Sequence, residues 1–227
     1  MENNFKVIIK SNVIIKVLWI ITLILIFLGV ISMVLKYHLG FPTAKNFVPQ
    51  FGLEHESNLP TYFSALLLLI SALLIWIISN YKNNLNDSFT RNWQVLSFIF
   101  LYLSIDEAAT VRSLLNNGDI TISVTLLCIL IPFHIKFLLL LPSDTRNEFL
   151  RAATCYVSGA LGLEIIEGIY LSNTYHEDFF YGVLLVSEES LEMIGSLLFI
   201  KSLLKYLSKV TEYVNIELLL EQQTAKA

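Results

Sequence analysis

The feature that most constrains the fold is a series of apolar runs, each long enough to cross a lipid bilayer. The first run is unbroken from Val17 to Leu35. It is too long for the hydrophobic region of a signal peptide, so we expect an uncleaved first span. Further apolar runs follow at 62–79, 93–115, 120–141, 149–172 and 179–206.

A helix needs roughly 20 apolar residues to cross the hydrocarbon core, and these runs are of that length. They lack the alternation of strands, and an open sheet edge cannot be satisfied in hydrocarbon. Hydrophobic residues make up 55% of the 227-residue chain, which leaves no room for a soluble catalytic domain. The sequence therefore predicts an all-α polytopic membrane protein. It would consist of a single bundle of six transmembrane helices over residues 1–206 and a short cytoplasmic tail over 207–227.

The basic residues predict how these helices are oriented, because short loops rich in Lys and Arg stay on the cytoplasmic side. In a six-span chain they gather at the two termini and in the second and fourth connections: Lys6, Lys10, Lys82, Arg91, Arg146, Lys205 and Lys209. The opposite connections hold only Lys45 outside a span. We therefore expect both termini to be cytoplasmic, in a plasma membrane of the bacterial inner-membrane type.

Composition and motifs exclude several functional classes. The net charge is -4 and there is no basic run, which argues against binding to nucleic acid. Cys128 and Cys155 both lie in apolar runs, where a disulfide framework is not expected. The chain contains no GxxxxGK[ST], GxSxG or HExxH motif, so nothing supports nucleotide-driven, serine-nucleophile or zinc-protease chemistry. These absences leave open whether the protein is an enzyme.

Seven carboxylates inside the predicted spans are the most informative feature for function. They are Asp106, Glu107, Glu164, Glu167, Glu188, Glu189 and Glu192. A carboxylate at the centre of a span costs about 2.5 to 3.5 kcal/mol, so these groups must be neutralised, paired or hydrated, and must face the bundle interior. Their positions along the helices place them from near the midplane into the outer half. The sequence therefore predicts a cation- or proton-binding site in that region.

Spacing within two of the spans indicates which acids act together. Glu164 and Glu167 are three residues apart, as are Glu189 and Glu192, so each pair shares one helix face. Two such pairs from neighbouring helices could ligate one divalent metal ion. No ExxH motif occurs in any span, which argues against a standard di-iron site.

Other polar residues could complete such a site. His55 and His176 lie in predicted outer loops and could complete a metal shell, although each is also explained as a solvated interfacial histidine. Arg112, at the outer end of the third span, is expected to pair its charge with an acid on the fifth or sixth span, or else to contact lipid headgroups. His134 follows Pro132, and we expect it to hydrogen bond a neighbouring helix rather than bind a metal.

Helix packing offers a structural explanation for part of this pattern. Gly159 and Gly162 would let a neighbouring helix approach the fifth span, and we expect Gly162→Leu to overpack that contact. The acids could also form a network of protonated groups that only fixes the bundle. The hydroxyl groups available to that network belong to Ser104, Thr110, Ser187 and Ser190. Such a network accounts for two acids more easily than for seven.

The leading functional hypothesis is a membrane carrier or sensor whose carboxylates bind a divalent cation or couple protons. The second is an intramembrane metal-dependent enzyme acting on a lipid or quinone, with Glu164, Glu167, Glu189 and Glu192 as ligands. The third is a non-catalytic assembly subunit whose acids meet a basic helix of a partner. A divalent metal ion is the one cofactor implied. The expected partners are the lipid bilayer and either a second copy of the chain or another membrane protein.

Overall fold

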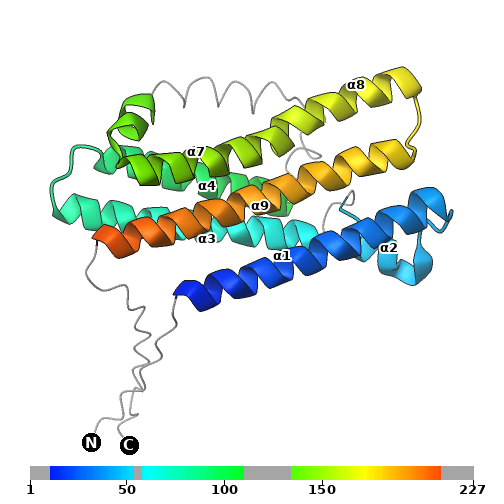
Figure 1. Ribbon diagram of the computed structural model, residues 1–227, viewed down its shortest axis with the longest axis horizontal. Coiled ribbons are helices and arrows are strands. Elements are labelled where there is room, and N and C mark those ends of the chain that lie inside the picture. The colour runs from blue at the N-terminus through cyan, green and yellow to red at the C-terminus, as the bar shows by residue number, and fades with distance from the viewer. Residues whose placement is uncertain (1–10, 54–57, 110–133, 211–227) are drawn as a thin grey trace, which may run out of the picture.

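The computed structural model describes residues 11–53, 58–109 and 134–210, and the regular structure in these ranges is entirely helical (Figure 1). Seven α-helices lie wholly within the described part of the chain. They are α1 (Ser11–Met33), α2 (Phe47–Phe51), α3 (Leu59–Asn84), α4 (Thr90–Ala109), α7 (Ser143–Val157), α8 (Glu164–Thr174) and α9 (Phe179–Val210). The prediction of an all-α protein is therefore confirmed.

Two of these helices continue into π-helical turns, whose hydrogen bonds reach one residue further than those of an α-helix. The turn Val34–His38 extends α1, and the turn Ser158–Leu163 joins α7 to α8. The second turn produces one helical segment from Ser143 to Thr174, which is longer than the predicted span 149–172.

Three helical segments in the described residues are long and apolar enough to cross a membrane: Ser11–His38, Leu59–Asn84 and Ser143–Thr174. The structure therefore gives three candidate spans in the described residues, and the count of six stays a prediction. α9 has 32 residues, but acids in its first half and lysines in its second half interrupt its apolar character. α4 has 20 residues with polar side chains toward both ends. The predicted span 120–141 lies mostly outside the described residues. Its described part is helical over 134–140.

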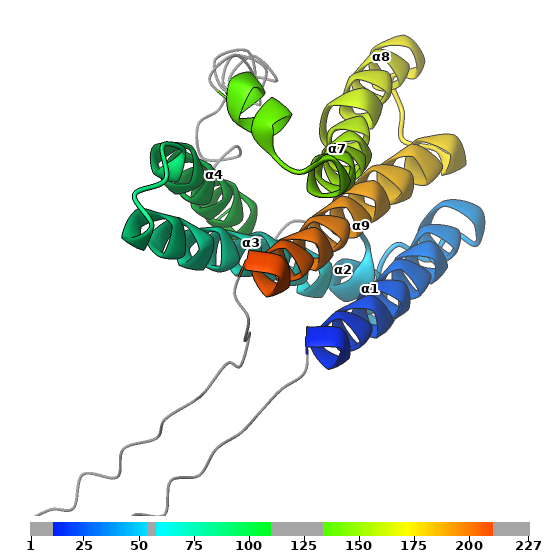
Figure 2. The ribbon, with the colours of Figure 1, turned by 60° about the vertical axis from the view of Figure 1, so that its left-hand side comes forward.

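α9 is the central helix of the described bundle. It packs against α1, α3 and α7, while α4 packs against α3 (Figures 1 and 2). Met193, Leu197, Ile200 and Leu203 are fully buried, and their spacing of three or four residues forms a single apolar stripe on α9. Residues of α9 beside this stripe, on the side of α7 and α8, therefore lie between helices.

Buried serine hydroxyls hold α4 against α3. Ser97 donates to the carbonyl oxygen of Ala72 at 2.9 Å, and Ser104 donates to that of Ala65 at 2.8 Å. Small hydroxyl side chains allow close helix approach, and these bonds satisfy their donors in apolar surroundings. Ser104 thus donates to α3 and not to a network of acids.

An aromatic cluster fills the bundle near the end where α9 finishes. Trp93 of α4 is 1% exposed, and its ring is stacked on Tyr206 with the centroids 5.3 Å apart. The rings of Phe137 and Phe149 meet the same indole edge-on at 4.9 and 6.2 Å. Offset and edge-on contacts of this kind add to the free energy gained from burial. The cluster joins α4, α7 and α9 to the helical segment 134–140.

The exposed side of α1 is apolar. Ile20, Leu23 and Phe27 are each more than half exposed in the isolated chain. Large exposed apolar surfaces mark contacts with a membrane or with another protein. Together with the length of Ser11–His38, this surface supports a helix that faces lipid.

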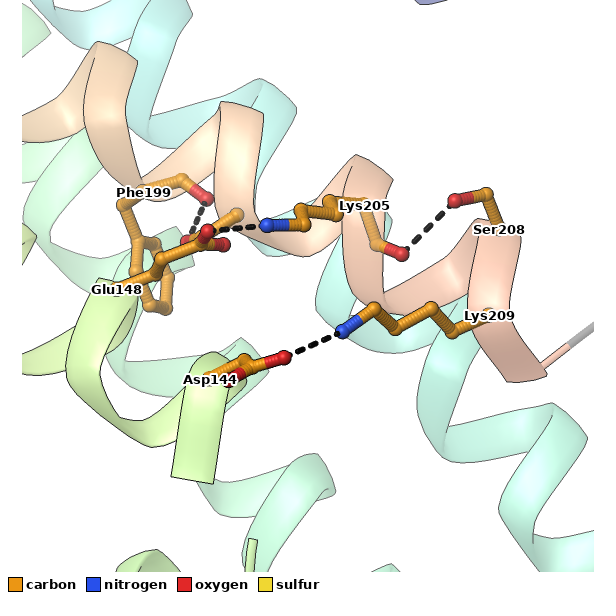
Figure 3. Close-up of polar contacts among 7 residues, drawn as sticks. Asp144, Glu148, Phe199, Lys205, Ser208 and Lys209 are labelled. Carbon is orange, nitrogen blue, oxygen red and sulfur yellow. Dashed lines mark hydrogen bonds and ion pairs between the residues drawn. The ribbon is translucent and has the colours of Figure 1, made fainter. Parts of the chain in front are cut away.

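Ion pairs at one end of the bundle join α7 to α9. Lys205 pairs with Glu148, and the Nζ atom of Lys209 lies 3.5 Å from the Oδ2 atom of Asp144 (Figure 3). Lys82 is also ion-paired, at the connection between α3 and α4, which lies at the same end of the bundle (Figure 1). This is the end that the positive-inside rule predicts to be cytoplasmic.

Candidate functional site

Two of the predicted acids form a pair between neighbouring helices. A side-chain hydrogen bond joins the carboxyl groups of Glu167 in α8 and Glu188 in α9. Glu167 is buried, with 9% of its surface exposed, and Glu188 is half-buried. The Oε1 atom of Glu167 is buried without a hydrogen-bond partner in the described part of the structure. Because ionised carboxylates offer only acceptors, a hydrogen bond between two carboxyl groups requires one proton.

The pair lies inside the bundle, toward the end opposite the ion pairs of α7 and α9. Glu167 precedes Thr174, the last residue of α8, by seven residues. Glu188 follows Phe179, the first residue of α9, by nine residues. At 1.5 Å per residue, the two groups lie about 10 and 14 Å from that end of their helices. Their similar depths allow the side chains to meet.

The π-helical turn Ser158–Leu163 sets the face on which α8 presents its acids. One additional residue in a helical turn rotates everything after it by about 100°, the angle that one α-helical residue covers. Glu164 and Glu167 follow this turn directly. Single π-helical turns inside α-helices are frequent at functional sites. The turn therefore decides which residues of α8 face α9.

Two glycines bring α7 and the π-helical turn into close contact with α9. A Cβ atom on Gly159 would lie 2.7 Å from the carbonyl oxygen of Glu188, and one on Gly195 would lie 2.6 Å from the backbone nitrogen of Tyr156. Both distances are too short for a side chain, so each position requires glycine. The expectation for Gly162 was wrong. Gly162 is exposed, and a Cβ atom there would meet only the Cβ of its own turn's Ser158, at 4.0 Å.

Three further acids influence this pair without forming part of its hydrogen bond. Glu164 repels negative charge on Glu167, and Glu189 and Glu192 repel negative charge on Glu188. The Cγ atom of Glu192 lies 3.2 Å from the position that a Cβ atom on Gly159 would take, so this side chain runs along the π-helical turn. This repulsion between like charges makes it unfavourable for all five carboxyl groups to be ionised together.

The two predicted acids of the third span lie on another helix interface. Asp106 and Glu107 are partly exposed near the end of α4, which packs against α3. Glu167 and Glu188, by contrast, lie on α8 and α9. The structure therefore joins two of the seven predicted acids in one hydrogen-bonded pair and keeps the acids of α4 on a separate pair of helices.

The predicted metal site and carboxylate cluster are not found in the described residues. Within 11–53, 58–109 and 134–210, no group of three or more His, Cys, Asp or Glu side chains is arranged to hold a metal ion. His176 is exposed, and its Nδ1 atom lies 2.7 Å from the carbonyl oxygen of Thr174 in its own loop. His55 and Arg112 lie outside the described residues. A metal shell needs several ligands that converge, and the described ranges hold no such group.

The three serine hydroxyl groups of the proposed structural network donate their hydrogen bonds elsewhere. Ser187 and Ser190 donate to the carbonyl oxygens four residues earlier in α9, at 2.7 and 2.6 Å. Ser104 donates to α3, and Thr110 lies outside the described residues. The expected hydrogen bond of His134 to a neighbouring helix is confirmed, because its Nε2 atom lies 3.2 Å from the carbonyl oxygen of Asn92 in α4.

Asp178, at the start of α9, was not among the predicted site residues. It accepts a hydrogen bond from the hydroxyl of Tyr170 at 2.6 Å and one from the backbone nitrogen of Tyr181 at 2.9 Å. These two donors stabilise the carboxylate and hold the pKa of Asp178 below its ordinary value. An Asp directly before an apolar helix is a typical N-cap, so the sequence contained a signal for this role.

A second group at the same end connects α1 to the loop before α9. Lys36 and Tyr37, from the π-helical extension of α1, both bond the Oε2 atom of Glu177, at 3.1 and 3.2 Å. A Cβ atom on Gly182 would lie 2.7 Å from the ring of Tyr37, so α1 and α9 are in close contact here. No spacing rule in the sequence links residues that are about 140 positions apart.

The described residues define a class: an all-α protein with three segments suited to crossing a membrane and a hydrogen-bonded carboxyl pair between two helices. The chain belongs to the family described as Domain of unknown function (DUF8692), which matches residues 17–207. Comparisons with curated proteins and with solved structures found no match. The matched range includes both members of the carboxyl pair.

Proposed function

We propose that this protein is an integral membrane protein in which Glu167 and Glu188 hold one proton between two helices and exchange it in a transport or sensing role. The observation that carries the proposal is the side-chain hydrogen bond between these two groups, one of them buried. Such a bond needs one protonated partner. Two carboxyl groups joined by a hydrogen bond bind and release protons as a unit.

The surroundings of the pair link its proton to the contact between the helices. Loss of the shared proton places two negative charges between α8 and α9, in a region where Glu164, Glu189 and Glu192 already repel them. The least costly response is a shift of α8 relative to α9. The π-helical turn before α8 is a natural place for that shift, since its hydrogen bonding already departs from the regular α-helix.

The same geometry favours a proton over a divalent metal ion. A calcium ion takes six to eight oxygen ligands, whereas one hydrogen-bonded pair supplies only the beginning of such a shell. In the described residues no set of three or more potential ligands is arranged for a metal. The divalent-cation carrier and the metal-dependent enzyme therefore have less support than proton exchange.

We place the pair on the outer side of the membrane. Lys82, Lys205 and Lys209 lie at the end of the bundle that would remain cytoplasmic, and the pair lies toward the opposite end. This proposal retains six spans, cytoplasmic termini and a plasma membrane of bacterial type. Protons would reach the pair from the outer aqueous phase.

Proton uptake by the purified protein in nanodiscs tests the function. The pH is lowered from about 11 to about 6, a range in which isolated carboxyl groups stay ionised and in which the Lys and Tyr side chains common to all four proteins titrate equally. We expect the wild type to take up about one proton more than Glu167→Gln or Glu188→Gln, because an amide can donate to the remaining carboxylate without a bound proton. Glu177→Gln is the matched control, since this exposed acid is paired with Lys36. Equal uptake by all four proteins would refute the proposal.

A further inference from the structure

An apolar groove of about 920 Å³ lies between α4, the helical segment 134–140 and the helix formed by α7 and α8. Leu96, Ile99 and Phe100 form the wall on α4, and Ile135 and Leu138 form the wall on the segment 134–140. Figure 2 shows this segment as the unlabelled green helix between α4 and α7. Ligand sites in proteins have volumes of about 300 to 1,000 Å³, so the groove is large enough for an extended apolar ligand.

The third wall belongs to Ser143–Thr174, one of the segments suited to crossing a membrane. Ala153, Val157, Leu161 and Ile165 line the groove on this side. From Ala153 to Ile165 the helix rises about 18 Å, which is more than half of the roughly 30 Å of a hydrocarbon core. A groove at this depth faces hydrocarbon, so its occupant must be apolar along most of its length.

Arg146 lies at the inner end of this groove and forms no ion pair with another described residue. It stands four residues before Leu150, a lining residue, and so lies on the same face of α7. One nitrogen, Nη1, donates to the carbonyl oxygen of Leu139 at 3.0 Å. The neighbouring acids Asp144 and Glu148 pair with lysines of α9 (Figure 3). The guanidinium therefore keeps donors for an anion from outside the described chain.

We propose that this groove binds an acyl chain of an anionic phospholipid from the cytoplasmic leaflet, with the lipid phosphate held by Arg146. The apolar walls match a hydrocarbon chain, and the planar fork of a guanidinium matches the oxygens of a phosphate. Anionic lipids are attracted to basic groups on the cytoplasmic side of membrane proteins. This inference is independent of the Glu167–Glu188 proton pair and goes beyond the function proposed for it.

Trp93 provides a reporter directly behind the groove. Its buried ring lies 4.9 Å from that of Phe137, which lines the groove. Replacing Trp19 and Trp76 with Phe leaves Trp93 as the only tryptophan of the three. Brominated acyl chains quench the fluorescence of a nearby indole. Bulk lipid reaches a buried indole poorly, so its quenching reports lipid bound next to it. In phosphatidylcholine vesicles we expect brominated phosphatidylglycerol to quench Trp93 saturably, on the order of ten-fold more tightly than brominated phosphatidylcholine.

Two variants distinguish lipid bound in the groove from lipid of the surrounding bilayer. Ala153→Phe fills the groove and should abolish the saturable quenching, whereas Arg146→Gln should remove the preference for phosphatidylglycerol. Ile20→Phe, on the exposed side of α1, is the matched control and should change neither. The comparison of the two lipids in the parent protein requires no variant. Equal, unsaturable quenching by both lipids would overturn the inference, and so would an absence of quenching, the result expected if the chain itself fills the groove.

Discussion

Gly159 in the π-helical turn lies so close to α9 that a Cβ atom there would stand 2.7 Å from the carbonyl oxygen of Glu188. The obstacle is backbone, which cannot rotate away as a flexible side chain can. The neighbouring positions Leu191 and Glu192 would also be crowded, at 3.1 and 3.2 Å. Gly159 therefore sets the spacing between the π-helical turn and α9 at the level of Glu188.

A first prediction concerns this spacing. Gly159→Ala should destabilise the protein by about 1 to 3 kcal/mol, because the added methyl group overpacks a backbone contact. Unfolding in detergent, by heat or by denaturant, measures the loss. Gly162→Ala is the control: its Cβ atom would meet only Ser158, at 4.0 Å, so stability should be retained or slightly raised. Equal destabilisation by both changes would show that the contact with α9 is not the cause.

A second prediction is that Glu167 and Glu188 are coupled in stability. Either change to Gln removes the need for the shared proton, so the second change should add little to the first. A double-mutant cycle should give a coupling free energy of about 0.5 to 3 kcal/mol. The cycle between Glu188→Gln and Asp106→Asn, which lie on different helix interfaces, should be close to additive. Additivity in the first cycle would mean that the two carboxyl groups act separately.

A third prediction follows from Asp178. The hydroxyl of Tyr170 and the amide of Tyr181 hold the pKa of Asp178 below its ordinary value of 3.8. Because the folded-state pKa is depressed, the stabilisation is present above 3.8 and is lost as the pH falls through the folded-state value. Tyr170→Phe should raise the pKa of Asp178 and flatten the loss of stability in acid, as followed by unfolding between about pH 5 and pH 2.

The control for this experiment is Tyr175→Phe, a change in the same connection at a residue that is 88% exposed. It should leave the loss of stability between about pH 5 and pH 2 unchanged. An identical loss in Tyr170→Phe and the wild type would show that the hydrogen bond to Asp178 does not contribute to folding.

A fourth prediction concerns topology. A reporter fused after Asn86, in the connection between α3 and α4, should remain cytoplasmic, as should one at Ala227. One fused near Asn46, before α2, should be exported. These outcomes follow from the lysines at the α3–α4 and α9 ends of the bundle. Export of the reporter at Ala227 would exclude an even number of spans with both termini inside.

The helical class could be predicted from the apolar runs, because hydrocarbon admits few other structures. The limits of the helices could not, since polar residues extend them. Asn58 begins α3 by accepting the backbone N–H of Thr61 at 3.0 Å, before the apolar run starts. The number of spans was not determined either. Whether α9 crosses a membrane depends on what its charged side chains meet, and this is a property of the neighbouring helices.

The cation- or proton-binding site stays a prediction, but one contact expected within it is present. Overlapping depths placed the acids of the fifth and sixth runs near one another, and Glu167 with Glu188 is such a contact. The particular pair could not be predicted, because spacing rules assume a uniform α-helix and the π-helical turn rotates α8 by about one residue. Because the sequence does not reveal this rotation, Gly162 was expected at a contact that Gly159 makes instead.

Infrared spectroscopy of the protein in nanodiscs tests the shared proton between Glu167 and Glu188 most directly, because a protonated carboxyl group has a carbonyl stretching band separate from the bands of carboxylates. At a pH near 8, where isolated carboxyl groups are ionised, the wild type and Glu177→Gln should show this band. Glu167→Gln and Glu188→Gln should both lack it. A wild-type spectrum without the band, or a band that persists in both variants, would contradict a proton held between α8 and α9.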